Sequence, residues 1–223
     1  MSFNSHITDI NWIFVKYLLK EPKTMTDPAK PRVDPRVLRT RQLLKDALID
    51  LLQEMDLEKI SVNRIAERAT INRVTFYLHY RDIPDMLEKM ADDMVEDIRR
   101  VWNQSEANDR TPEQTESQML VHLLEHIAAH SKFYKIVLGS KRTPIFTERL
   151  LKMLSESIAL RIERSGSDLA FTKSGTPKDI AIWYGSAALI GTIVAWVRND
   201  MPYSPAFLAK HFAIMTKTND AVE

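Results

Sequence analysis

The stretch ISVNRIAERATINRVTFYLHYRDIPDML, residues 60–87, decides the fold. It predicts two short helices over 62–69 and 73–79, joined by a tight turn and followed at once by a longer helix. Ser61 and Asn72 stand where the short helices would begin, and both are favoured N-caps because their side-chain oxygens accept helix N–H groups. Helices this short do not form alone in water, so an apolar stripe must pack on a neighbour. Its residues are Ile65, Ala66, Ala69, Ile71 and Phe76.

The second short helix would then present basic, polar and aromatic side chains to solvent, namely Arg73, Thr75, Tyr77 and His79. A helix pair with such a face has the features needed to read the DNA major groove. Basic residues predominate over 30–45 and again over 59–81, whereas the charged residues over 46–58 are all acidic. This separation would steer the module onto phosphate in one orientation.

Composition narrows the class of protein. A chain of 223 residues is long enough for one large domain or two small ones. The absence of cysteine excludes disulfides and thiolate chemistry. Because the net charge is only +1, binding to nucleic acid must depend on local charge. The apolar run over 3–19 is too short and too charged to span a bilayer and does not resemble a secretory signal. We expect residues 1–33 to be a disordered N-terminal extension, in which residues 1–24 are either an upstream extension of the reading frame or a loosely packed arm.

The rest of the chain predicts helices only. Proline follows a capping residue at Asp34-Pro35, Thr111-Pro112, Thr143-Pro144, Thr176-Pro177 and Ser204-Pro205. Proline is favoured at the first helical position, where its missing N–H would have no partner. Together with apolar residues at helical spacing, these signals predict helices over 36–53, 83–103, 112–129, 132–138, 144–164, 177–199 and 205–217. No alternation typical of strands is present, so the predicted fold is all-α.

The predicted helix over 177–199 is unusual because residues 180–197 carry no charge. That length is barely sufficient for a membrane span. Small and polar residues make it only mildly apolar, and its neighbours are amphipathic, so we expect it to be buried in protein on all sides. Its small residues form a seam consisting of Ala181, Gly185, Ala188, Thr192 and Ala195. We therefore predict that one side packs within its own domain and the other against a second subunit.

On the residues quoted above, the chain resembles the TetR/AcrR family of bacterial transcriptional repressors. The family pattern is a short helix, a turn, a Thr-Phe-Tyr-x-His-aromatic core and a further helix. The segment WYGSAALIGTIVAWVRNDMPYSPAFLAKHF, residues 183–212, resembles the last two helices of one family type, which pair with their copies in a four-helix interface that here would include Phe207. The resemblance implies a three-helix helix-turn-helix domain over 34–81 and a helical ligand-binding and dimerisation domain over 82–223.

It also implies a cytoplasmic homodimer that binds a double-stranded DNA operator and releases it when a small-molecule effector binds. Tyr77 and His79 match family residues that bond phosphate, and Thr75 matches a position that reaches the DNA backbone. Residues Asn63, Arg73 and Val74 fall where base contacts are made. The whole predicted DNA-contacting set is Arg39, Ser61, Asn63, Arg64, Arg73, Val74, Thr75, Tyr77, His79 and Arg81.

Two positions depart from the family pattern. Val74 stands where a small residue is usual, which would restrict the bases that fit. Ile83 stands where a lysine is frequent, so a phosphate clamp is missing, and we expect Arg81 to replace it. Both departures affect the DNA sequence that is preferred rather than DNA binding itself.

A different kind of chemistry is offered by His122-Leu123-Leu124-Glu125-His126, which has the H-x-x-E-H pattern of some zinc proteases. His130 lies on the same helical face, so a metal-dependent hydrolase or a regulatory metal site is an alternative. Because no further ligand motif is present, we expect neither an enzyme, nor a metal, nor a cofactor. A third alternative is an adaptor that binds only proteins.

An effector pocket would lie among the helices that follow residue 82. Ligand pockets are mostly apolar with a few polar groups. The candidate lining residues are Trp102, Met119, His122, His126, Phe133, Tyr134, Phe146, Met153 and Trp183.

Overall fold

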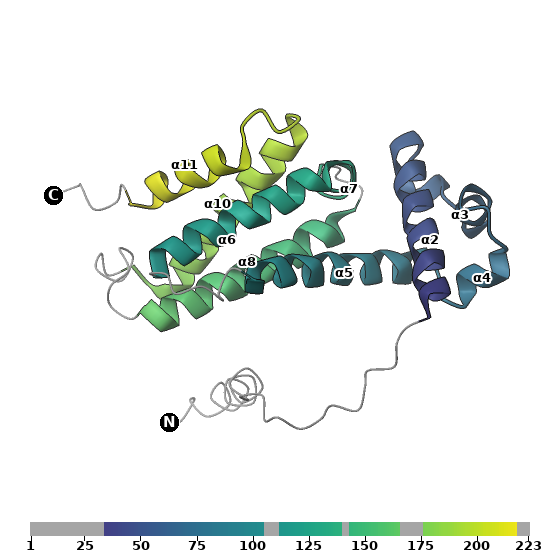
Figure 1. Cartoon of the computed structure of the whole chain (residues 1–223), viewed down its shortest axis with the longest axis horizontal. Coiled ribbons are helices and arrows are strands. Elements are labelled where there is room, and N and C mark those ends of the chain that lie inside the picture. Colours follow the sequence, from purple (N-terminus) through teal and green to yellow (C-terminus); the bar gives the residue numbers. More distant parts are fainter. Residues whose placement is uncertain (1–33, 105–111, 140–142, 166–175, 218–223) are drawn as a thin grey trace, which may run out of the picture. The chain divides into compact units, whose positions relative to one another are not determined.

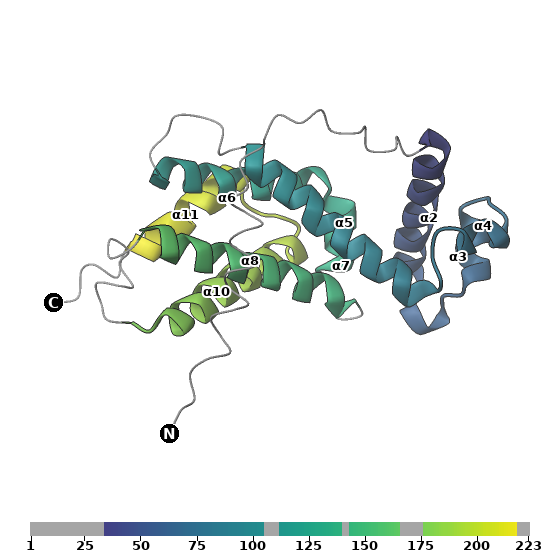
Figure 2. The ribbon, with the colours of Figure 1, turned by 90° about the horizontal axis from the view of Figure 1, so that it is seen from below.

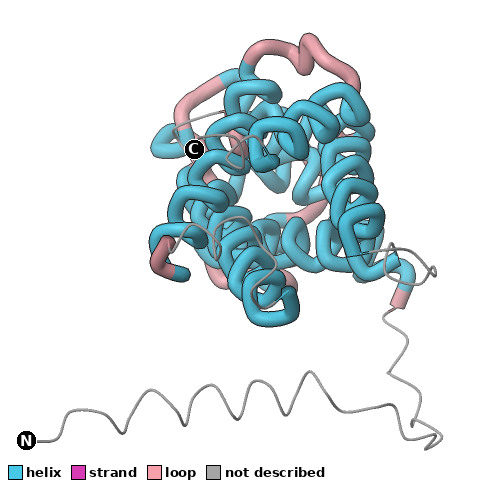
Figure 3. The backbone as a smooth tube through the Cα atoms, turned by 90° about the vertical axis from the view of Figure 1, so that its left-hand side faces the viewer, coloured by secondary structure: helices cyan, strands magenta, loops and turns pink. Residues whose placement is uncertain are grey.

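In the computed structural model, residues 34–104, 112–139, 143–165 and 176–217 are described, and they contain helices and loops without any strand (Figure 3). The predicted all-α class is confirmed for this part of the chain. The predicted N-terminal extension and the predicted cap Thr111 lie outside it. By their contacts, the described residues divide into two units between Arg39 and Thr40.

The helices begin and end close to the predicted positions (Figure 1). They are α2 Pro35–Glu54, the 3-10 turn η1 Leu57–Lys59, α3 Val62–Arg68, α4 Arg73–Tyr77, α5 Ile83–Gln104, α6 Pro112–Ala129, α7 Ser131–Val137, α8 Pro144–Ser165, α10 Lys178–Arg198 and α11 Pro205–Lys217. Helix α4 ends two residues before the predicted His79, because the His79 N–H donates to the Phe76 carbonyl at 2.9 Å in a tighter, 3-10-type bond. Pro177 is the N-cap of α10 rather than its first residue.

Both predicted caps are present in the helix pair. The Ser61 hydroxyl accepts from the Arg64 N–H at 3.4 Å, and the Asn72 side chain accepts from the Val74 N–H at 2.8 Å. Between the two helices, Thr70 has a φ of 56°, in the left-handed region. The chain can therefore reverse within two residues and bring α4 back against α3.

The core under the helix pair is built from residues of α2, α3 and α4 and from Tyr80, three residues after α4. Leu44 and Leu48 of α2, Ile65 of α3 and Phe76 of α4 are completely buried. Tyr80 joins this cluster, and its burial raises the pKa of its hydroxyl to about 12. Apolar contact with α2 therefore supplies the stability that α3 and α4 cannot supply alone.

The helices that follow pack on one another in pairs (Figures 1 and 2). Helix α5 contacts α6 and α8, α10 contacts α8, and α11 contacts α6. Helix α10 buries Ile190, Ile193, Trp196 and Val197, and the Trp196 indole N–H donates to the Tyr203 carbonyl at 2.9 Å. Among the described helices, α10 alone is long and apolar enough to cross a membrane, a test that core helices of soluble proteins also pass.

Candidate nucleic-acid interface

Helix α4 separates its residues between the core and solvent as its sequence predicts. Phe76 points into the core and is completely buried, whereas Arg73, Val74 and Tyr77 are exposed and Thr75 is half-buried. The Asn72 cap fixes the start of the helix and hence the direction of each side chain. Because Phe76 is anchored in the core, Arg73, Val74 and Tyr77 face outward.

Arg73 is not free on this surface. Its guanidinium donates to the Tyr77 hydroxyl at 3.0 Å and lies 5.5 Å from the centroid of the Tyr77 ring. The two residues are one helical turn apart, which is the spacing at which side chains meet. The contact holds the cation beside the phenol, so the two side chains form one polar unit on the outer face of α4.

The predicted contacts from α3 are also on the surface. Ser61, Asn63 and Arg64 are exposed at the start of this helix. The Ser61 hydroxyl already accepts a helix N–H, and the Arg64 guanidinium donates to the Met55 sulfur at 3.0 Å. Arg39 is exposed near the start of α2.

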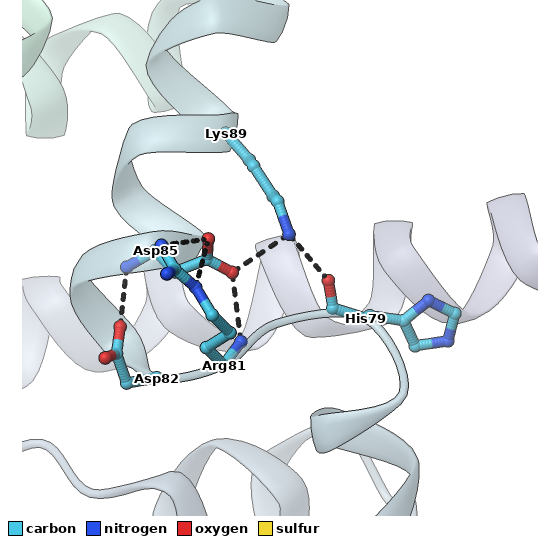
Figure 4. A network of polar contacts seen from close by, with 5 residues as sticks. All are labelled: His79, Arg81, Asp82, Asp85 and Lys89. Carbon is cyan, nitrogen blue, oxygen red and sulfur yellow. Dashed lines mark hydrogen bonds and ion pairs between the residues drawn. The ribbon is translucent and has the colours of Figure 1, made fainter.

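The start of α5 carries a cluster of charges that the sequence analysis did not single out (Figure 4). Asp85 is buried and accepts from both the backbone N–H and the guanidinium of Arg81, at 3.0 and 3.2 Å. Lys89 donates to Asp85 at 2.9 Å and to the His79 carbonyl at 3.1 Å. Asp82 caps the helix by accepting from the Asp85 N–H at 2.7 Å. Arg81, predicted to clamp phosphate, is therefore paired with a carboxylate.

These contacts shift two pKa values. The backbone N–H of Arg81, followed by the Lys89 ammonium, lowers the pKa of Asp85 to about 2. Burial lowers the pKa of His79, and the Arg41 and Lys89 cations lower it further. At neutral pH Asp85 is charged and His79 is neutral, so the His79 ring acts as a hydrogen-bonding group rather than as a cation. The ring points away from the Asp85 cluster in Figure 4.

Three features near the end of α4 and the start of α5 were missed by the sequence analysis. The Asp82–Asp85 pair has the three-residue spacing of a capping box, which would have marked Asp85 as a helix-start carboxylate. Lys89 follows Asp85 by one turn, the spacing of a helical ion pair. Leu78 is 76% exposed directly after α4, and hydrophobic spacing alone gives no signal for an exposed leucine.

The candidate effector residues divide into two groups. Tyr134, Phe146 and Met153 are buried, and Trp102, Met119, His122, His126 and Phe133 are partly buried. Ring contacts at 4.5 to 5.8 Å between centroids join His130, His126, Tyr134, Phe133 and Phe146 into one cluster from α6, α7 and α8. Trp183, by contrast, is 65% exposed on α10, so the structure corrects its predicted place in an interior pocket.

The histidines of α6 do not form a metal centre. Among the described residues, no three His, Asp or Glu side chains are arranged to hold a metal ion. The His130 Nδ1 lies 2.9 Å from the His126 carbonyl, so one of its ring nitrogens is engaged by its own helix. Burial, followed by the nearby His130, lowers the pKa of His126.

The predicted dimer residues lie on two sides of α10. Ala181 is buried, and a Cβ added at Gly185 would lie 3.2 Å from Ile158 of α8, so this end of the seam faces its own subunit. Ala181 therefore cannot contact a second subunit directly, which corrects that prediction. Thr192 is half-buried, whereas Ala188, Ala195 and Phe207 are exposed. The large apolar side chains exposed on α10 and α11 are Ile180, Trp183, Tyr184, Phe207, Ile214 and Met215.

Known proteins share both the sequence pattern and the fold. The family model described as a transcriptional regulator C-terminal region, of the TetR type, matches residues 114–218. The HTH-type transcriptional regulator YxbF of Bacillus subtilis is 27% identical over 168 residues, covering 75% of this chain and 42% of that protein. The present chain thus spans less than half of that relative.

Solved structures agree on the fold. A TetR transcriptional regulator from Streptococcus agalactiae is 24% identical, with a TM-score of 0.60 over 82% of this chain and 96% of that one. FadR from Bacillus subtilis, solved in complex with stearoyl-CoA, is 15% identical, with a TM-score of 0.56 over 79% and 97% of the two chains. The chain thus shares the fold of these solved regulators, and α3 and α4 form its helix-turn-helix pair. The chain therefore resembles the TetR family, whose C-terminal model matches residues 114–218, slightly less than half of the chain.

Proposed function

We propose that this protein is a homodimeric, effector-responsive transcriptional repressor of the cytoplasm, which binds an operator through α3 and α4. The observation that carries the proposal is that α4 buries Phe76 in the core and exposes Arg73, Val74 and Tyr77 to solvent. The likeness of the chain to the TetR family supports it. Residues 34–81 would form the DNA-binding part, and residues 82–223 the regulatory and dimerising part.

In this proposal some side chains contact phosphate and others contact base edges, according to their chemistry. Thr75, Tyr77 and the neutral His79 bond phosphate, and Arg39, Ser61, Arg64 and Arg81 hold the flanking backbone. Asn63, Arg73 and Val74 reach base edges, where an arginine pairs best with guanine. Arg81 would have to share its guanidinium between Asp85 and phosphate. Binding would be strongly dependent on salt, because phosphate contacts release counterions.

Dimerisation is supported by the exposed apolar residues of α10. Ile180, Tyr184, Ala188, Gly191 and Ala195 are three or four residues apart and lie on its outer face, where no atom lies within 4 Å of a Cβ added at Gly191. Large contiguous apolar surfaces usually mark interaction sites. A second copy docked there would present two α4 helices to half-sites about one helical turn apart.

An effector response is supported by the aromatic cluster and by one polar atom of α6. The Gln118 side-chain oxygen is buried and lacks a hydrogen-bond partner among the described residues, which is costly unless a ligand or water supplies a donor. Gln118, His122 and His126 follow at intervals of one helical turn. FadR of Bacillus subtilis was solved with a fatty acyl-CoA, so an apolar ligand with a polar end is the class to test first.

The alternatives have less support. The H-x-x-E-H segment is not joined by further ligands in the described part of the chain, so a metal-dependent hydrolase is not favoured. An adaptor that binds only proteins would leave the basic α3–α4 surface without a role.

The proposal is tested by selecting sequences from a random duplex DNA pool with the full chain. We expect one palindromic operator to be enriched, and we expect Tyr77→Ala and His79→Ala to weaken binding to all operator variants by about tenfold, the loss typical of one or two hydrogen bonds. Fluorescence anisotropy with labelled operator measures both effects. If no sequence is enriched and genomic fragments stay unbound in dilute buffer, the proposal is wrong.

A further inference from the structure

Two exposed aliphatic side chains occupy the outer face of the reading helix. Val74 is 66% exposed and Leu78 is 76% exposed, the highest value for a large apolar residue in the described part of the chain. Leu78 is the C-cap of α4 and keeps helical dihedrals, with φ −70° and ψ −20°. The two residues are therefore separated by one helical turn and form a short apolar ridge.

The other large side chains of the helix are already in contact with protein groups. Phe76 is in the core, and Arg73 and Tyr77 bond each other. Among the described residues, Val74 and Leu78 are the large aliphatic side chains of this segment that stay exposed. When an apolar group covers adjacent exposed leucine and valine side chains and removes them from water, the free energy falls.

The major groove of DNA offers one apolar group, the C5 methyl of thymine. Cytosine places an amino donor in the groove, which hydrocarbon cannot satisfy, and an unpaired buried donor is costly. The Cβ atoms of residues one turn apart are about 5–6 Å apart, a distance that spans one or two base-pair steps of about 3.4 Å. The ridge can therefore contact methyl groups on neighbouring base pairs.

We propose that Val74 and Leu78 together read thymine methyl groups in the operator, so that the preferred half-site contains neighbouring thymines opposite α4. This inference rests on the proposed function, because it assumes that α4 enters the major groove. It assigns a specificity-determining role to Leu78, and it pairs Leu78 with Val74 as one contact surface.

Deoxyuridine provides a sharp test, because it differs from thymidine only by the missing methyl. Each thymine of the selected operator is replaced in turn by deoxyuridine, and the dissociation constant is measured by fluorescence anisotropy at fixed salt. We expect one or two positions per half-site to weaken binding by roughly fourfold each, the effect of burying about one hydrocarbon carbon. Replacement elsewhere should have no effect.

At one of those positions, the Leu78→Ala variant should have the same dissociation constant for the operator with thymidine and for the operator with deoxyuridine. Leu160→Ala is the matched control, since Leu160 is an exposed leucine of α8, and it should keep the full difference. Thermal melts check that both variants fold.

The inference is overturned if the wild-type protein binds its operator tightly but does not distinguish deoxyuridine from thymidine, or if Leu78→Ala retains the full difference. Either result leaves the proposed function standing. If the protein enriches no DNA sequence at all, both fail. If operator binding is tight and neither the deoxyuridine replacements nor Leu78→Ala changes it, the ridge would instead contact a protein partner.

Discussion

At the scale of single residues, Asp85 organises the start of α5. Its carboxylate is buried and accepts from Arg81 and Lys89, and Lys89 also holds the carbonyl of His79. Through Lys89, this carboxylate is linked to His79, two residues after the end of the reading helix. Because the carboxylate is surrounded by donors, its ionised form stabilises the fold.

Asp85→Asn should lower the melting temperature by about 2–4 °C near pH 7. The pKa of Asp85 is lowered from 3.8 to about 2 in the folded chain, so its stabilising contribution is complete above pH 4 and is lost as the pH falls toward 2. The difference between wild type and variant should therefore shrink over that range. Melts followed by circular dichroism between pH 2 and 7 measure it. A difference that is constant with pH would contradict this assignment.

At the scale of helices, α3 and α10 end in the same way. In each, two backbone N–H groups donate to carbonyls of the last turn. In α3 the Thr70 N–H donates to the Glu67 carbonyl and the Ile71 N–H donates to the Ala66 carbonyl. This is the Schellman arrangement, which needs a left-handed residue that is usually glycine. Here Thr70 occupies that position with a φ of 56°. A β-branched residue is strained in this region.

Thr70→Gly should therefore stabilise the protein. Relief of left-handed strain, about 1–2 kcal/mol, outweighs the extra freedom that glycine gives the unfolded chain, about 0.4–1 kcal/mol. We expect a gain of about 1 kcal/mol and a rise in melting temperature of about 2–4 °C. Thr70→Val keeps the β-branch and should show no gain. Equal melting temperatures for the glycine variant and wild type would show that the turn is not strained.

At the scale of the whole molecule, the net charge is only +1, but the charged residues are unevenly distributed. Basic residues gather on the α3–α4 module. A larger group of exposed apolar residues lies on α10 and α11. The basic surface is suited to binding a polyanion such as DNA. The apolar surface is suited to binding a second copy of the chain. Operator binding should therefore depend on dimerisation, because two linked modules bind far more tightly than one.

Ala188→Glu places a charge on the open face of α10 and should give a monomer by analytical ultracentrifugation. Operator affinity should then fall by about 100-fold or more. Ala129→Glu, at an exposed alanine of α6, is the control and should leave both properties unchanged. An Ala188→Glu variant that remains dimeric would place the subunit interface elsewhere.

Much of this protein could be predicted from local sequence. Ser61, Asn72 and the prolines mark helix starts through bonds made within one turn, and these starts agree with the structure to within a residue or two. The outward direction of Arg73 and Tyr77 follows from the burial of Phe76 a few residues away. Such features depend on neighbours in the chain, which the sequence displays directly.

The sequence by itself therefore determined the helical class, the helix starts and the outward face of α4, because caps and helical spacing are local. Tertiary structure alone decided that Ala181 is buried and Gly185 lies against Ile158 of α8 while Trp183 faces solvent. Helix α10 is apolar around its whole circumference, so no periodicity shows which side is covered. Only the packing of α8 against it selects the buried side.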